Sequence, residues 1–479
     1  MPNLTPDETE IRILLPCHRH TRAEIEDLLS CLPGEVKLIL TYRNSMPDEY
    51  GTWVGQSDQI EIADLSSLDH TSYDLECPDL FVASIESLFT DPATALMWER
   101  SATSAAKHAS GKLTGSLPSF HKGSAQIAKE VVKAIQRLKR LNPSFLIFGS
   151  TPHGIGPWVL LKVAQQMSIP VLVIDRTAVD GFYRILEKIS DVEDEIEIGP
   201  LSAEEKAIHS ERLETMVSDV QHSYKRAQPE SERKRFENNR GKYINQINLW
   251  KQNWYAPARS INAIRSWRKL KSMSKRLSSF NVNRYAIFFL HYQPERTTVP
   301  DGGLFGSQLN ALLLLRSALP KDIVLLVKEH PSTFTFRCDP LARDPLFYDQ
   351  INSRKDVHFV DIGTDNFELI DSAVVAATIT GTVARESLIR GTPAIFFGRS
   401  FLLGSAGCFR YRNDNGLAGF LSRVAQGQFD RQEVSSRAIQ AMTRRSENSL
   451  YSPGPWSDPT KISALKRLFL SEWFKQKFL

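Results

Sequence analysis

Short, mostly apolar runs alternate with stretches of helical spacing in the first third of the chain. Strand candidates are Ile11–Leu15, 36–40, Phe145–Phe148 and 171–174, and helix candidates are 21–31, 125–141 and 157–167. Within 125–141, apolar residues recur every three or four positions, as on one face of a helix. Short apolar strands that alternate with helices predict a parallel sheet covered by helices on both faces.

The same alternation returns in the last 200 residues or so of the chain. Strand candidates are 285–290, 323–327, 357–360, 373–378 and 394–397, and helix candidates are 308–318, 345–352, 366–370 and 383–390. Ser307 precedes the first of these helices, and Gly391 with Pro393 follows the last, as helix start and stop signals do. The pattern predicts an α/β protein with two Rossmann-like doubly wound domains that face a cleft, where ligands bind at the carboxyl ends of strands.

The 479 residues exceed the ~250–300 at which a single core stops growing, which supports this division. We expect one Rossmann-like domain in 1–202, a second in 281–450, and a C-terminal helix in 451–479. Between the two domains, residues 203–280 are polar, show helical spacing and lack a strand signal. A helical segment is therefore expected to connect the two domains.

Composition excludes several classes of protein. Hydrophobic residues make up 42% and charged residues 24%, which excludes global disorder, and the net charge of +4 gives no reason to expect nucleic acid. The five cysteines are odd in number and lack metal-ligand spacing, so neither a disulfide framework nor a zinc site is expected. A polar, acidic amino end and the lack of an apolar stretch of ~20 residues predict a cytoplasmic protein.

The motif Lys328-Glu329-His330-Pro331 directly follows a predicted strand. It places an ammonium and an imidazole at a strand end, where both could contact a phosphate or sugar oxygen. Pro331 fixes the turn and so directs the imidazole. Taken alone, the motif would be better interpreted as an ordinary strand-end turn with a solvated histidine.

A second polar turn, Thr380-Gly381-Thr382, lies between a predicted strand and a helix. Hydroxyls, backbone N–H groups and the positive end of the helix can bind a phosphate there, and Gly381 permits close approach. Thr380 or Thr382 could also be a simple helix cap. Glu386 lies one turn further, on the same face as Thr382, where it could accept hydrogen bonds from a ribose. The two turns together describe a nucleotide site.

Two further loops follow predicted strands. The first runs from His291 to Thr298 and continues to Asp301-Gly302-Gly303; its Gln293, Glu295 and Arg296 are candidate substrate ligands, although the last two could pair with each other. The second, Gly149 to Gly154, contains His153, and Asp180 lies beyond the next strand. A general base for a hydroxyl acceptor must be a carboxylate or histidine, for which Asp180 is the first candidate and His153 the second.

Other chemistries lack their motifs. The chain contains no Gly-x-Gly-x-x-Gly, P-loop or Gly-x-Ser-x-Gly sequence, which disfavours the usual dinucleotide, ATP and hydrolase sites. No Asp-x-Asp pair accompanies the nucleotide site, so the sequence requires neither a metal nor another cofactor.

The stretch from Tyr285 to Phe409 resembles the capsule polysaccharide biosynthesis family, which includes Kdo transferases of capsule and lipopolysaccharide assembly. The resemblance rests on the His291–Thr298 loop, on Lys328 to Pro331, on Phe367-Glu368-Leu369-Ile370, and on Thr380 to Thr382 through Glu386, Gly391 and Pro393. The first half of the chain is similar only in Thr151-Pro152-His153 and in Asp91 to Ala95. About a quarter of the chain thus matches with several motifs in order.

This resemblance implies a GT-B glycosyltransferase whose second domain holds a CMP-activated acidic sugar and whose first domain holds the acceptor. By similarity, His330 and Thr380 to Thr382 contact the CMP phosphate, and Glu386 contacts the ribose. The acidic-acidic-Gly triplet that carries the base in related sialyltransferases is missing, with Val179-Asp180-Gly181 the nearest match. Asp180, His153 and Glu295 are therefore the candidate catalytic residues.

The sequence is interpreted as a glycosyltransferase that moves Kdo from CMP to a capsule, lipopolysaccharide or other glycan or glycolipid acceptor. Two alternatives stay open. A CDP-polyol phosphotransferase has similar His-Pro and hydroxyl-rich motifs, and a non-catalytic glycan-assembly protein could keep the fold without turnover.

From Asn238 to Phe280 the chain has ten Lys or Arg and no Asp or Glu. A solvated linker is the ordinary interpretation of such a segment. Cations without acids repel one another unless an anionic partner is present, and Trp250, Trp254, Tyr255 and Trp267 lie among them. We therefore expect the protein to associate peripherally with the anionic inner face of the cell membrane. We do not expect it to bind nucleic acid.

Overall fold

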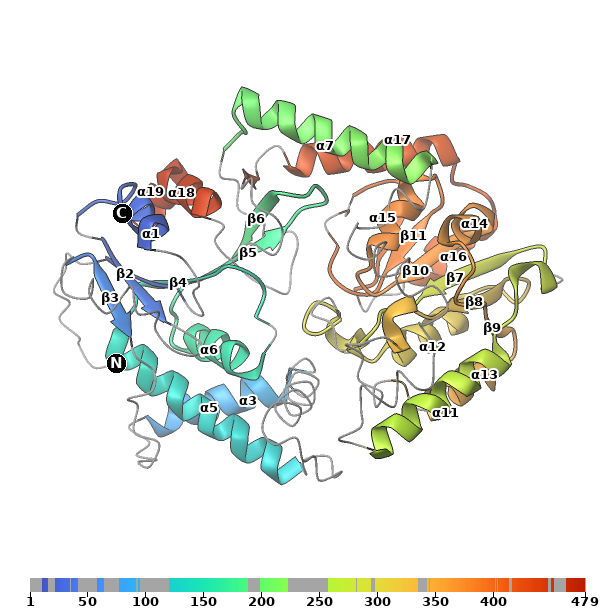
Figure 1. Ribbon diagram of the computed structural model, residues 1–479, viewed down its shortest axis with the longest axis horizontal. Helices are drawn as coiled ribbons and strands as arrows, with labels where there is room; N and C mark the ends of the chain where they lie inside the picture. Colours follow the sequence, from blue (N-terminus) through green and yellow to red (C-terminus); the bar gives the residue numbers. More distant parts are fainter. Residues whose placement is uncertain are drawn as a thin grey trace. The chain divides into compact units, whose positions relative to one another are not determined.

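The computed structural model shows two compact units, each built on its own sheet (Figure 1). The division between the units falls within α7 (Ala203–His222), after Arg212, and again within α17 (Arg431–Ser446), after Thr443. The structure describes residues 11–15, 22–34, 36–41, 58–63, 77–91, 94, 120–152, 154–187, 199–222, 257–280, 282–293, 298–334, 343, 345–400, 402, 404–412, 416–446, 449–451 and 462–478.

The sheet of the first unit has the strand order β13-β6-β5-β4-β1-β2-β3. β1 to β5 run parallel, whereas β6 is antiparallel to β5 and β13 is antiparallel to β6. The central order 3-2-1-4-5 is that of a doubly wound sheet. The strands are β1 (Ile11–Leu15), β2 (Val36–Thr41), β3 (Ile60–Ala63), β4 (Phe145–Phe148), β5 (Val171–Arg176), β6 (Phe182–Leu186) and β13 (Leu450–Tyr451).

Helices cover both faces of this sheet (Figure 1). On one face lie α3 (Pro78–Phe89), α5 (Phe120–Leu141) and α6 (Ile155–Gln166), and on the other α1 (Arg22–Leu29), α18 (Ile462–Leu470) and α19 (Glu472–Phe478). The ring of Phe474 lies 5.3 Å from that of Phe145 on β4, edge to face. The C-terminal helices therefore complete the core of the first unit.

The second unit is built on a fully parallel sheet with the order β12-β11-β10-β7-β8-β9. When the six strands are numbered along the chain, their order in the sheet is 6-5-4-1-2-3, as in the Rossmann fold. The direction in which successive strands are added to the sheet changes between β7 and β10. The strands are β7 (Tyr285–Phe289), β8 (Val324–Lys328), β9 (Val357–Phe359), β10 (Val375–Thr378), β11 (Ala394–Phe396) and β12 (Cys408–Arg410).

The helices of the second unit also form two layers (Figure 1). One core cluster joins the sheet to α11 (Pro257–Met273), α12 (Gln308–Ala318), α13 (Pro345–Asn352) and α16 (Gly416–Ala425). α14 (Asn366–Ser372) and α15 (Thr382–Ile389) pack against each other and against β7, β10 and β11. Three short 3₁₀ turns, η1 (Leu277–Ser279), η2 (Gly303–Gly306) and η3 (Pro331–Phe334), complete the elements.

The predicted fold of two doubly wound α/β domains is confirmed. The chain between them is helical in its described parts, α7 and α11, although Lys275 forms an isolated bridge with Val360. The sequence analysis did not predict strands β3, β6, β12 and β13. Among the residues that the structure describes, no helix is long and apolar enough to cross a membrane.

Candidate functional site

Polar turns gather at the carboxyl edge of the second sheet, where the strand order reverses. β7 and β10 are neighbours in this sheet, yet their following segments lead to helices α12 and α15, which lie on opposite faces. In doubly wound sheets ligands bind in the crevice that this divergence creates. The turns after β7, β8 and β10 that the sequence singled out therefore lie at one edge of one sheet.

His291, the second residue after β7, links two of these turns. Its Nε2 accepts a hydrogen bond from the backbone N–H of Thr380 at 3.2 Å and lies 3.0 Å from the Thr378 hydroxyl. Its backbone N–H and carbonyl both pair with the Gln308 amide, at 2.7 and 3.0 Å. Nε2 is thus the nitrogen through which this ring contacts the β10 turn. His291 thus fixes the β10 turn in place.

Gly381 is required by this close approach. A Cβ atom at this position would lie 2.8 Å from the Thr378 hydroxyl oxygen and 3.4 Å from the His291 Nε2 atom. Gly381 precedes α15 with extended backbone, and no side chain caps the helix. The first backbone N–H groups of α15 and the exposed Thr382 therefore stand at the sheet edge, where they could bind an anion.

Glu329 organises the turn after β8. Its Oε1 accepts the backbone N–H of His330 at 2.8 Å and the Thr333 hydroxyl at 2.9 Å. Its Oε2 accepts the Arg343 Nε at 2.8 Å and the Tyr348 hydroxyl at 2.9 Å. Glu329 and Arg343 are 1% and 2% exposed. Four hydrogen bonds satisfy this buried carboxylate, so it shapes the turn rather than contacting a ligand.

His330 lies on the open side of the turn that Glu329 shapes. Its ring is half-buried and packs against that of Tyr292, with centroids 5.3 Å apart. Pro331 starts η3, in which the Thr333 N–H donates to the His330 carbonyl at 3.0 Å. Backbone and ring are thus both held, while part of the imidazole remains accessible to a ligand.

Lys328, expected to face a phosphate, points into the protein instead. It is 3% exposed, and its Nζ donates hydrogen bonds to the Thr364 carbonyl and to Asn366 Oδ1. Burial lowers its pKa from 10.5 to about 8, although Asp365, Asp361 and Glu386 act in the opposite direction. The ammonium fastens the end of β8 to the loop before α14.

This buried lysine makes stability depend on pH. Above a pH of about 8 the folded lysine loses its proton, whereas the unfolded chain keeps it up to about 10.5. Unfolding therefore takes up a proton in this window, and the contribution of Lys328 to the free energy of unfolding rises with pH between these values. We expect Lys328→Met to remove that rise.

Urea unfolding at about pH 7 and about pH 9.5 measures this effect. Lys321→Met, a change at an exposed lysine, is the matched control and should keep the wild-type difference between the two conditions. The same pH dependence in Lys328→Met as in the wild type would contradict the account.

A buried loop supports the turn after β10 from the other side. Asp301 accepts a hydrogen bond from Arg399 Nη2 at 2.6 Å, and its carbonyl accepts the Arg399 N–H at 3.0 Å. A Cβ atom at Gly302 would lie 2.8 Å from Ile379 Cγ2, and one at Gly398 would lie 2.5 Å from Thr380 Cγ2. These glycines allow the three turns to touch, which rigidifies the edge of the sheet.

The other predicted residues fall in three places. Gln293 donates from Nε2 to the Gly306 carbonyl at 2.7 Å. Asp180 is exposed in the turn between β5 and β6 of the first unit, where its carbonyl accepts Arg212 Nη1 at 2.7 Å. His153, Glu295 and Arg296 lie outside the described residues.

The structure thus brings together His330, Pro331, Thr380, Gly381, Thr382 and Glu386 with Gln293 and Lys328 at one sheet edge. Sequence reasoning missed the residues that hold them there, His291, Glu329 and Arg343. The signal for the first two was their position, since each stands within two residues of a strand's carboxyl end. Arg343 carried no local signal.

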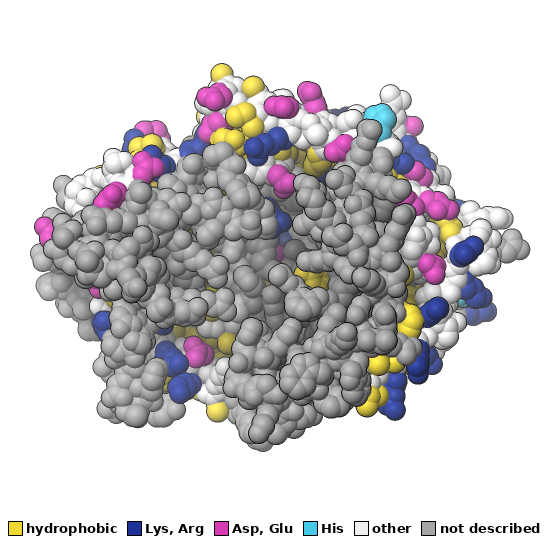
Figure 2. Space-filling view, in the orientation of Figure 1, with side chains coloured by type: hydrophobic (Ala, Val, Ile, Leu, Met, Phe, Trp, Pro, Cys, Tyr) yellow, Lys and Arg dark blue, Asp and Glu magenta, His cyan; other side chains and the backbone are white. Residues whose placement is uncertain are grey.

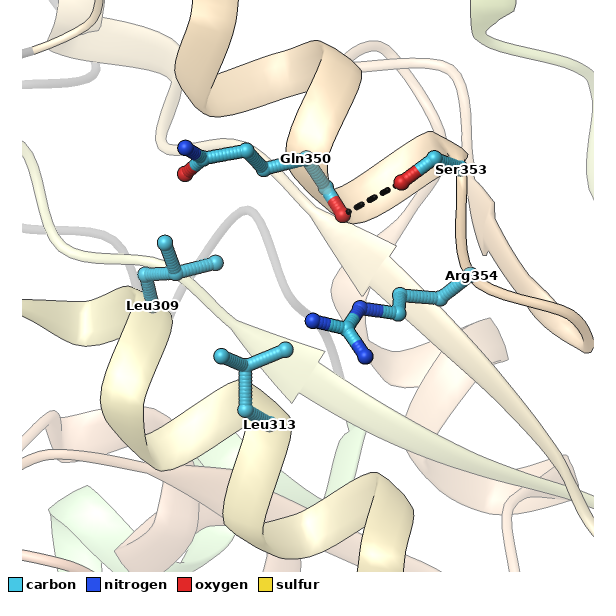
Figure 3. A pocket seen from close by; sticks show the side chains of 5 residues that line it. All are labelled: Leu309, Leu313, Gln350, Ser353 and Arg354. Carbon is cyan, nitrogen blue, oxygen red and sulfur yellow. Dashed lines mark hydrogen bonds between the residues drawn. The ribbon is translucent and has the colours of Figure 1, made fainter.

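One cavity of the second unit lies away from the polar turns. A cavity of about 410 Å³ opens between α12 and α13, lined by Leu309, Leu313, Gln350, Ser353 and Arg354 (Figure 3). It contains none of the strand-end residues. Within the described part of the chain, no group of three His, Cys, Asp or Glu side chains is placed to bind a metal.

No protein-family model matches the chain, and no curated protein matches its sequence. Among solved structures, Thermosulfurimonas dismutans KpsC, a beta Kdo 2,4 transferase, is similar over 62% of this chain and 87% of its own, with 14% identity and a TM-score of 0.30. Anabaena Alr3699/HepE in complex with UDP and glucose is similar over 92% and 96%, with 11% identity and a TM-score of 0.28. The Neisseria meningitidis UDP-GlcNAc 2-epimerase is similar over 91% and 99%, with 10% identity and a TM-score of 0.24. Likeness at this level does not decide the activity of this chain.

Proposed function

We propose that this protein is a GT-B glycosyltransferase that moves an acidic sugar, Kdo in our assignment, from a CMP donor to a glycan or glycolipid acceptor. The observation that carries the proposal is the polar edge of the second sheet. There His330 stands on the turn that Glu329 shapes, and Thr382 and Glu386 lie on α15, after the turn that His291 holds. The family resemblance of the same turns supplies the CMP donor and the sugar.

In this proposal the edge binds the CMP half of the donor. The free N–H groups at the start of α15 and the Thr382 hydroxyl bind the phosphate, and His330 donates a hydrogen bond to it. Glu386, half-buried one turn along α15, accepts hydrogen bonds from the ribose. Negative charge grows on the phosphate as the sugar leaves, so donors already fixed in place stabilise the transition state more than the ground state.

Deprotonation of the acceptor hydroxyl needs a general base. Asp180, His153 and Glu295 remain our candidates, with Asp180 first because its side chain is exposed at the carboxyl end of β5. The acceptor is assigned to the first unit and the donor to the second. The proposed acceptor is a capsule, lipopolysaccharide or similar glycan.

Donor consumption and nucleotide binding test the proposal together. The full-length protein is incubated with CMP-Kdo or CDP-glycerol in the presence of candidate acceptors, and CMP and CDP binding are measured by calorimetry. We expect CMP to bind and CMP-Kdo to be consumed. Consumption of CDP-glycerol instead would identify a CDP-polyol phosphotransferase, and binding of neither nucleotide would identify a non-catalytic protein.

A membrane-bound acceptor would fit the surface of α11. Arg265, Arg268 and Lys271 are exposed, and Ile261, which shares a helix face with the two arginines, is 43% exposed. Leu346 on the neighbouring α13 is 65% exposed. Figure 2 shows Lys and Arg beside hydrophobic side chains at the lower right, where Figure 1 places α11 and α13. Cations beside exposed apolar groups are typical of segments that lie on anionic membranes.

We propose salt-sensitive association of this surface with anionic membrane. Each Lys or Arg near such a surface contributes ~1 kcal/mol of attraction, so changing Arg265, Arg268 and Lys271 to Glu should weaken binding to anionic liposomes at least about tenfold at low salt. Co-sedimentation at low and high salt measures this. Arg140, Lys206 and Lys321 changed to Glu are the control, with the same change in net charge at exposed positions elsewhere. Equal sedimentation of the two variants would show that α11 does not bind the membrane and only connects the two domains.

A further inference from the structure

A buried ion pair lies in the first unit, whereas the proposed donor site belongs to the second. Asp175 on β5 and Arg184 on β6 are register partners, and Arg184 Nη2 donates to Asp175 Oδ2 at 2.9 Å. The Arg184 and Asp175 side chains are 4% and 7% exposed. Neither residue has a role in the proposed donor site.

The guanidinium of Arg184 is only partly satisfied. Its Nε and Nη1 atoms are buried and have no hydrogen-bond partner in the described part of the chain. By contrast, the buried guanidinium of Arg343 donates from Nε to Glu329 and from Nη2 to the His291 carbonyl. Buried polar groups without partners are rare in native proteins because they are costly, and a ligand group can supply the partners that these two nitrogens lack.

The position of this pair is one where α/β sheets bind ligands. The register Phe148↔Val173 places Asp175 two residues beyond the end of β4, level with the loop that leads into α6. Arg184 therefore stands at the carboxyl edge of the parallel strands, where ligands of doubly wound domains bind. The amino end of α6, which no side chain caps, lies at the same edge and favours negative charge.

We infer that Arg184 is an anion-binding residue, whose Nε and Nη1 donate hydrogen bonds to a carboxylate or phosphate group of a ligand. The hydrogen bond from Arg184 Nη2 to Asp175 fixes the orientation of the guanidinium, and therefore the directions of Nε and Nη1. Hydrogen bonds from a charged donor to a charged acceptor are the strong ones, and exclusion of water strengthens them further. Both nitrogens are shielded from bulk solvent, so binding requires a local movement of the strand-end loops.

This inference goes beyond the donor site and does not depend on the proposed function. Within a glycosyltransferase, the anion would be a group on the acceptor, which we assign to the first unit. The binding experiment needs neither a nucleotide donor nor turnover. If no anionic probe binds, the proposed CMP-donor site of the second unit is unaffected. If the CMP-donor proposal is wrong, binding of an anion to Arg184 can still be tested by this experiment.

Calorimetry of the full-length protein with glycerol 3-phosphate, glucuronate and glucose tests the site. We expect one of the two anionic probes to bind, which distinguishes a phosphate from a sugar carboxylate as the ligand group, and we expect glucose not to bind. Arg184→Gln should weaken the anionic probe at least about tenfold. Arg140→Gln, at an exposed arginine of α5, should leave its affinity unchanged.

Asp175→Asn keeps the test decisive if Arg184→Gln does not fold. Asparagine retains an oxygen that accepts the Arg184 hydrogen bond, but it removes the negative charge beside the bound anion. The affinity for the anionic probe should therefore rise several-fold. Lack of binding by both anionic probes, equal binding of glucose, or unchanged affinity in both Arg184→Gln and Asp175→Asn would overturn the inference. So would a structure of the soaked protein with only an internal water at these nitrogens.

Discussion

Replacing His330 with alanine is expected to lower turnover of CMP-Kdo on the order of 100-fold or more. The expectation follows from how the imidazole is held. Its backbone N–H is fixed by Glu329 at 2.8 Å, its ring packs on Tyr292, and it remains half-buried at the sheet edge. A donor fixed in place before the reaction stabilises charge that develops on the departing phosphate without the cost of reorganisation.

Steady-state kinetics separate this role from simple binding. If His330 acts on developing charge, His330→Ala should lower kcat far more than it raises KM, because the lost interaction is stronger in the transition state. His330→Gln, which can still donate a hydrogen bond, should recover part of the loss. His222→Ala is the matched control, at an exposed histidine on α7. Wild-type kcat in His330→Ala would remove His330 from the proposed mechanism.

The framework of the fold follows from local patterns. β1 and β4 occur at the predicted residues, as do α12 and α13. A buried parallel strand is visible in the sequence as a short apolar run, and an amphipathic helix as apolar residues every three or four positions. The strands that were missed depend on pairing instead. β13 has only two residues and exists because they pair with β6, which is distant in sequence. A run so short has no period to detect.

The candidate site shows the same limit at the level of side chains. The position of His330 after a strand could be predicted, because parallel strands place their carboxyl ends at one edge. The direction of Lys328 could not, because its partners Thr364 and Asn366 lie on a different turn. Arg343 likewise reaches Glu329 from a separate segment. Long-range contacts decide which polar residues face a ligand and which ones hold the site together.

Glu329 gives the largest expected effect on stability. Glu329→Ala leaves Arg343, 2% exposed, without its carboxylate and removes the acceptor of the Tyr348 and Thr333 hydroxyls. Breaking a buried ion pair by removal of one partner costs about 3–5 kcal/mol. We expect a loss of this size in the free energy of unfolding measured with denaturant. Glu433→Ala, at an exposed pair with Arg437, is the control and should cost less than about 1 kcal/mol.

A double variant identifies the cause of the loss. When Arg343→Met is combined with Glu329→Leu, neither charge of this ion pair remains buried, so the double variant should lose less stability than the sum of the two single changes. Glu329→Gln keeps the shape of the side chain and tests the link to chemistry: it loses the charge that orients the His330 turn, and kcat should fall even where the protein stays folded. Additive losses would show that the broken ion pair is not the cause of the lost stability. Wild-type kcat in Glu329→Gln would show that Glu329 stabilises the second unit without positioning His330.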